Sequence, residues 1–116
     1  MNMPSYKTVT QTIMAIWLDF GCTVLPVEIS GEVLLGRKGA SDQKVIDLSG
    51  FDAYALGVSR IHAALFCENG RLYLEDRGSD EGTWLRDQLC MPFKRYELMP
   101  GDVIRLGRLE MRLNGN

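Results

Sequence analysis

The chain has 116 residues, with 13 Lys and Arg against 15 Asp and Glu, for a net charge of −2. This balance argues against a protein that coats nucleic acid, which usually needs a clear basic excess. Apolar residues make up 46% and charged residues 24% of the chain, close to the averages of ordered globular domains. The length fits one domain, and we expect residues 1–11 to form a loose arm and residues 12–116 a single domain.

The cysteines and apolar runs carry no sign of a metal site, a disulfide framework or a membrane segment. Cys22, Cys67 and Cys90 lie far apart without a Cys-x-x-Cys pair, and there is one histidine, so no zinc site is predicted. The strongest apolar run, 13–18, is too short to span a bilayer and lacks the features of a signal peptide. We therefore expect a cytoplasmic chain without cofactor, metal or membrane contact; its oligomeric state stays open.

Short apolar runs separated by turn signals predict strands along most of the chain. These runs are 12–19, 23–29, 33–35, 63–67, 72–74, 83–85, 96–98, 103–106 and 109–113. No stretch of ten or more residues repeats apolar side chains at helical spacing. The pattern predicts an all-β domain, either a sandwich or a barrel.

Two turns and one long segment punctuate this pattern. Asn69-Gly70 is a strong hairpin signal, because both central positions of a type I′ turn need positive φ. Pro100-Gly101 predicts a tight turn before the next strand. Segment 38–57 is predicted to be irregular, and loops of that length in a small domain are usually functional.

No catalytic template fits the chain, and we predict no enzyme. Ser59 and His62 are close in sequence, but the serine has no nucleophile elbow around it. The spacing of Gly36 and Gly39 matches neither phosphate-loop template. The carboxylates Asp80-Glu81 have no histidine or metal-ligand partner nearby in the sequence.

Four motifs in order are more specific than any of these patterns. They are Gly36-Arg37, Ser59-Arg60-Ile61-His62, Ser79-Asp80-Glu81-Gly82-Thr83 and Gly101-Asp102-Val103-Ile104-Arg105-Leu106-Gly107. In this order and spacing the chain resembles the forkhead-associated (FHA) domain family, over roughly residues 13–113. The resemblance implies a β-sandwich of about ten or eleven mostly antiparallel strands in two sheets. By residue type, we expect Trp84 and Leu85 in the core rather than on a contact surface.

The resemblance implies a module that binds a phosphothreonine-containing protein or peptide in Ser/Thr-kinase signalling. Arg37 matches the arginine that contacts the phosphopeptide, Ser59 the serine that bonds a phosphate oxygen, and Arg60 the residue beside it. A phosphothreonine is a near-dianion with three acceptor oxygens, so guanidinium and hydroxyl donors on loops suit it. No nucleic acid or membrane partner is expected.

Four further residues match positions that support the binding loops. His62 matches a structural histidine that ties these loops together. Gly36 and Gly82 match turn glycines, whose roles come from backbone geometry, and Thr83 matches the threonine that holds the following loop.

One departure from the family pattern falls on the binding loop. Asp80 and Glu81 stand where the family often has a threonine that holds phosphate and an asparagine that grips the peptide. At ~6 Å and surface-like screening, each carboxylate would repel a phosphate charge by on the order of 1 kcal/mol.

Three accounts of this departure remain open. The acids pair with Arg37 or Arg60, they select a basic residue in the ligand, or the ligand carries no phosphate. A bystander role for both acids, as ordinary charges of a loop tip, also stays open. The alternative function is therefore a degenerate FHA domain that acts as a phosphate-independent assembly or scaffold module.

Overall fold

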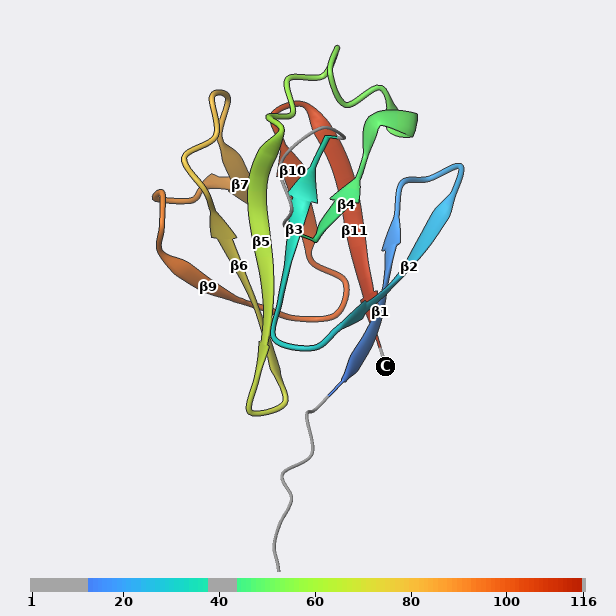
Figure 1. Ribbon diagram of the computed structural model, residues 1–116, viewed down its shortest axis with the longest axis vertical. Coiled ribbons are helices and arrows are strands. Elements are labelled where there is room, and N and C mark those ends of the chain that lie inside the picture. Colours follow the sequence, from blue (N-terminus) through green and yellow to red (C-terminus); the bar gives the residue numbers. More distant parts are fainter. Residues whose placement is uncertain (1–12, 38–43, 116) are drawn as a thin grey trace, which may run out of the picture.

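The computed structural model describes residues 13–37 and 44–115, which form two β-sheets packed face to face (Figure 1). The expected arm over residues 1–11, and the part of the irregular segment at 38–43, lie outside the described residues. Among the described residues, eleven strands and one short 3-10 helix are present. The predicted all-β sandwich of ten or eleven strands is confirmed.

The strands follow one another in a fixed order across each sheet. The six-stranded sheet runs β2 (Val24–Ile29), β1 (Met14–Asp19), β11 (Leu109–Gly115), β10 (Val103–Leu106), β7 (Thr83–Leu85) and β8 (Gln88–Leu89). The five-stranded sheet runs β4 (Val45–Asp47), β3 (Glu32–Gly36), β5 (Ile61–Glu68), β6 (Arg71–Asp76) and β9 (Arg95–Leu98). Neighbouring strands are antiparallel, except that β3 and β4 are parallel.

The core forms where alternate side chains of each strand point between the sheets. Leu72 and Leu74 of β6 and Met111 and Leu113 of β11 are buried in this way. The next inward position of β6 is Asp76, which is only 2% exposed. A buried carboxylate needs hydrogen-bond donors around it, so the end of β6 marks a change from apolar to polar packing.

The two predicted turns have the backbone geometry that their residues require. Asn69 and Gly70 both have positive φ, 54° and 75°, and join β5 to β6 as a two-residue hairpin turn. Gly101 has a φ of +90°, and the Asp102 N–H donates to the carbonyl oxygen of Met99 at 3.1 Å. This arrangement is a type II turn, so both turn predictions are confirmed.

Three details of the sequence-based prediction are wrong. Segment 38–57 is not wholly irregular, because it contains β4 and the 3-10 helix η1 (Ser49–Phe51). Strand β8 is also unpredicted; β4 and β8 have only three and two residues, too few to show a period. Trp84 is half-buried rather than a core residue, since it points away from the core beneath the Arg105 guanidinium, 4.7 Å from its ring.

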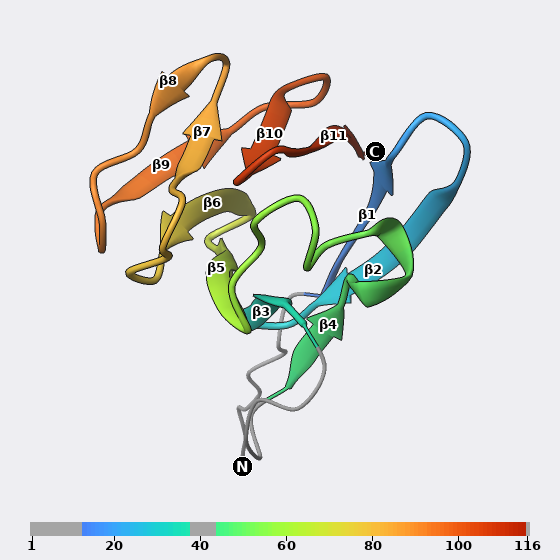
Figure 2. The same cartoon turned by 90° about the horizontal axis from the view of Figure 1, so that it is seen from above.

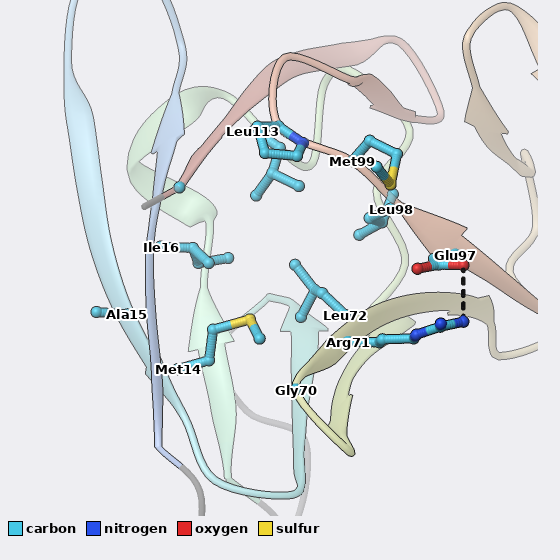
Figure 3. Close-up of a pocket in the computed structure, with 12 residues that line it drawn as sticks. Met14, Ala15, Ile16, Gly70, Arg71, Leu72, Glu97, Leu98, Met99 and Leu113 are labelled. Atoms are coloured by element: carbon cyan, nitrogen blue, oxygen red, sulfur yellow. Dashed lines mark ion pairs between the residues drawn. The ribbon is translucent and has the colours of Figure 1, made fainter.

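The two ends of the sandwich differ. Figure 2 looks down on the end where the segment between η1 and β5 crosses the gap between the sheets. At the opposite end, where β5 turns into β6, an apolar cavity of about 230 Å³ lies between the sheets (Figure 3). Its apolar lining comes from both sheets and includes Met14, Ile16, Leu113, Leu72 and Leu98.

Candidate functional site

A shallow groove lies at the end of the sandwich seen in Figure 2. It forms where three connections meet: the segment before β5, the β6–β7 loop and the β10–β11 turn. Its lining residues are Arg37, Tyr54, Ala55, Gly57, Val58, Ser59, Asp80, Glu81 and Arg108. The structure thus brings together four of the five predicted binding residues. Arg60 is exposed beside Ser59 but is not part of this lining.

Arg37 is held in place by its backbone and by its side chain. Its N–H donates to the Arg60 carbonyl oxygen at 2.9 Å, and its Nε donates to the Val58 carbonyl oxygen at 2.6 Å. The guanidinium lies over the ring of Tyr54, 4.9 Å from its centre. Neither Nη atom has a hydrogen-bond partner among the described residues, so both amino groups can donate into the groove.

Ser59 joins the segment before β5 to the β6–β7 loop. Its N–H donates to Nδ1 of His62 at 3.0 Å, and its Oγ accepts the Asp80 N–H at 3.1 Å. A serine hydroxyl can accept two hydrogen bonds and donate one. Because Oγ is the acceptor here, and no acceptor for its hydrogen lies among the described residues, the hydroxyl can donate to a ligand.

His62, the second residue of β5, is completely buried between these two connections. Its Nδ1 accepts from Ser59, so its Nε2 carries the proton and donates to the Gly82 carbonyl oxygen at 2.8 Å. Burial lowers the pKa of His62, because a charged imidazolium is disfavoured away from water. A neutral His62 therefore fixes both connections at once.

Asp76 organises the β6–β7 loop from inside. Its Oδ2 accepts the N–H groups of Gly78 and Ser79 at 3.0 and 3.3 Å. Its Oδ1 accepts the hydroxyls of Ser79 and Thr83, both at 2.6 Å. Sequence analysis missed Asp76, although an aspartate two residues before a glycine is the usual signal of a turn held by its own side chain.

Two glycines set the backbone distances in the site. A Cβ atom on Gly36 would overlap the carbonyl oxygen of Arg60, so only glycine lets β3 end this close to β5. Gly82 has a φ of +90°, a conformation that other residues rarely adopt. Its carbonyl oxygen accepts both the His62 Nε2–H and the Gly107 N–H, while Thr83 is buried beside it.

The two acidic residues of the groove differ in their surroundings. Oε1 of Glu81 accepts a hydrogen bond from Nη1 of Arg108 at 3.0 Å. Glu81 therefore pairs with an arginine that sequence analysis did not single out, and not with Arg37 or Arg60. The exposed carboxylate of Asp80 has no hydrogen bond or ion pair to any described residue. The negative charge of Glu81 is thus balanced by an arginine, whereas that of Asp80 has no such partner among the described residues.

Comparison with known proteins shows the family to which this chain belongs. The FHA domain model matches residues 33–107, and the chain belongs to the FHA domain family. The chain is 43% identical over 84 residues to Protein FraH of Nostoc sp. strain PCC 7120, covering 72% of this chain and 28% of that protein. It thus spans less than a third of this relative's length.

Solved FHA domains share the fold. One, from a study of phosphothreonine-dependent FHA domain interactions, is 27% identical, with a TM-score of 0.64 over 90% of this chain and 98% of that one. The FHA domain of an Arabidopsis thaliana hypothetical protein is 21% identical, with a TM-score of 0.70 over 97% of this chain and 94% of that one; this second likeness shows the fold alone.

Two further features are absent from the described residues. None of the helical structure in this part of the chain is long and apolar enough to cross a membrane. Nor do three or more His, Cys, Asp or Glu side chains gather here in a way that could hold a metal ion.

Proposed function

We propose that the chain recognises phosphothreonine-containing peptides or proteins and acts as a cytoplasmic interaction module in Ser/Thr-kinase signalling. The observation that carries this proposal is the convergence of Arg37 and Ser59 on one groove. Both have donors without a partner among the described residues, and both match the family's binding motif. The similar FHA domain studied for phosphothreonine-dependent interactions adds support.

The chemistry of the groove suits a phosphate monoester. The two Nη groups of Arg37 form a planar fork that can donate to two phosphate oxygens. The Ser59 hydroxyl can donate to the third oxygen, and the exposed Arg60 adds positive charge at the rim. Because FHA domains are binding modules and no catalytic set lines the groove, we propose binding without turnover, and no nucleic acid or membrane partner.

The second candidate function is phosphate-independent assembly by a degenerate FHA domain. The observation that favours it is the uncompensated carboxylate of Asp80, which lines the same groove as Arg37 and Ser59. A negative charge there opposes a dianionic ligand. Under this alternative, the groove or another surface binds a partner that carries no phosphate.

Titration with a degenerate phosphothreonine peptide library, and with the same peptides unphosphorylated, separates the two functions. The best phosphopeptide should bind wild type, and Arg37→Ala or Ser59→Ala should each cost roughly 1.5–3 kcal/mol of binding free energy. Arg95→Ala is the control, because Arg95 pairs with Glu68 outside the groove at 3.0 Å. Unfolding temperatures measured alongside should show that each variant is folded.

Two outcomes would contradict the phosphate proposal. Unchanged affinity in both groove variants would show that Arg37 and Ser59 do not bind the ligand. If wild type binds no phosphopeptide but captures a native partner after phosphatase treatment, the scaffold function stands instead.

A further inference from the structure

Arg108 occupies a position that none of the four motifs identifies. It follows Gly107 in the turn between β10 and β11, and its N–H donates to the Leu56 carbonyl oxygen at 2.7 Å. The turn lies tightly on this segment, since a Cβ atom on Gly107 would come within 2.7 Å of two carbonyl oxygens, those of Leu56 and Gly57. The position of Arg108 relative to the groove is therefore fixed by backbone contacts.

The Arg108 side chain bridges two walls of the groove. Its Nη2 donates to the Ala55 carbonyl oxygen at 2.7 Å, and its Nη1 donates to Oε1 of Glu81 at 3.0 Å. The same carboxylate lies close to the backbone of Gly57, where a Cβ atom would overlap it. Glu81 is thus confined by the Arg108 guanidinium and by the Gly57 backbone.

This confinement matters because a free carboxylate at position 81 would lower affinity for an anion. One unscreened like-charge contact near a phosphate weakens binding by about fivefold at surface dielectric. An arginine within hydrogen-bond distance cancels most of that field and limits the directions in which the carboxylate can turn. Arg37, on the β3 side of the groove, then faces a neutral pair rather than a negative charge.

We propose that Arg108 is a positioning residue for ligand binding: it neutralises Glu81 and holds its carboxylate so that the groove can accept a phosphate group. This inference rests on the proposed phosphothreonine recognition and deepens it. Arg108 acts through Glu81, which it touches, so removal of Glu81's charge should remove the need for Arg108.

A double-mutant cycle tests this coupling. The probe is the phosphothreonine peptide that wild type selects from a degenerate library, with its unphosphorylated form as the control ligand. We expect Arg108→Gln to weaken binding about fivefold and Glu81→Gln to leave it equal or up to about twofold stronger. The variant with both changes should bind within about twofold of wild type. Arg108→Lys, which keeps the charge, should lose less than Arg108→Gln.

An ion pair outside the groove, with the same separation, provides the control cycle. Arg95 and Glu68 are joined at 3.0 Å with similar exposure, 46% and 58% for their side chains against 61% and 45% for Arg108 and Glu81. Arg95→Gln, Glu68→Gln and their combination should leave affinity unchanged. The loss in Arg108→Gln should also shrink as salt is raised, because screening weakens repulsion between exposed charges.

The outcomes separate this inference from the function on which it rests. If wild type binds and Arg108→Gln binds equally well, the inference is wrong and phosphate recognition stands. If Arg108→Gln loses binding and Glu81→Gln does not restore it, Arg108 only supports the Ala55 backbone, and the inference is again wrong. If wild type binds no phosphopeptide at all, the proposed function is wrong, and this inference is wrong with it.

Discussion

The two ends of the sandwich handle the gap between the sheets in different ways. At the groove end, the buried side chains of His62 in β5 and Asp76 in β6 form hydrogen bonds with the connections above them. At the opposite end, Leu72 and Leu98 line an apolar cavity that no such network of described residues covers (Figure 3). An Arg71–Glu97 ion pair, 3.7 Å apart, is the polar feature at its rim.

This difference shows how one scaffold separates recognition from stability. A hydrogen-bond network holds donor groups in fixed directions, which an anion site needs, whereas apolar contacts are non-directional. Arg37 and Ser59 are aimed into the groove because buried polar groups beneath them fix the connections. The apolar end contributes burial without setting any such direction. Substitutions at the two ends should therefore have separable effects.

The largest expected effect is on the buried carboxylate of the groove end. Asp76→Ala removes an acceptor of four hydrogen bonds and leaves the donors of Gly78, Ser79 and Thr83 without it. We expect the free energy of unfolding to fall by roughly 3–5 kcal/mol, because breaking a buried charged network leaves unsatisfied groups. Urea unfolding measures this change, and phosphopeptide titration at low temperature should show weakened binding as well.

Leu98→Ala at the apolar end is the matched comparison. Leu98 is 4% exposed, and its truncation should cost roughly 2–3 kcal/mol of stability, at the low end for a core leucine because the site already borders a cavity. Binding by the folded fraction should not change. Loss of binding in Leu98→Ala, or intact binding and stability in Asp76→Ala, would contradict the separation of the two ends.

Predictability from sequence also differs between the two ends. Turn residues and alternation were enough to predict the hairpin at Asn69-Gly70 and the runs that became β7 and β10. The order and spacing of the motifs also predicted that Arg37 and Ser59 belong to one site, although they are 22 positions apart in the sequence. The cavity could not be predicted, because its size depends on how far the sheets diverge rather than on any local pattern.

The part of the site that sequence analysis missed consists of partners rather than motifs. Glu81 was recognised as a departure from the family, but its partner Arg108 lies 27 residues further along the chain, and nothing local marks that pairing. Asp76 was also missed, although the glycine two residues later signals a turn held by its side chain. The burial pattern of β6 places Asp76 on the core side with Leu72 and Leu74.

A smaller effect is expected from pH, again at the groove end. Burial holds the pKa of His62 below the ordinary value of 6.5, although the hydrogen bond to the Gly82 carbonyl oxygen and the charges of nearby carboxylates oppose this shift. Below pH 6.5 the unfolded chain therefore binds a proton that the folded chain does not, so stability falls as pH falls. The slope is at most about 1.4 kcal/mol per pH unit, and ends at the folded-state pKa.

Urea unfolding between pH 5.5 and 7.5 measures this slope. His62 is the single histidine of the chain, so His62→Gln should remove most of the dependence in this range. Protonation would also place a hydrogen on Nδ1, where the Ser59 N–H now donates, and phosphopeptide affinity should weaken over the same range. Stability that is flat or rises toward pH 5.5 would show that His62 is not held neutral by burial.

The smallest effect concerns the one acid of the groove without a partner. Asp80→Thr removes its charge and adds a hydroxyl, so phosphothreonine peptides should bind more tightly by about 1 kcal/mol, or roughly fivefold. Glu81→Asn alone should change affinity less, because Arg108 already compensates Glu81, and the double variant should gain little more than Asp80→Thr. Calorimetry at low and high salt measures both gains, which should shrink with screening.

If Asp80 instead contacts a basic residue of the ligand, Asp80→Thr would bind peptides carrying Lys or Arg near the phosphothreonine less tightly than wild type does. That result would make Asp80 a selectivity residue rather than a charge opposed to the ligand.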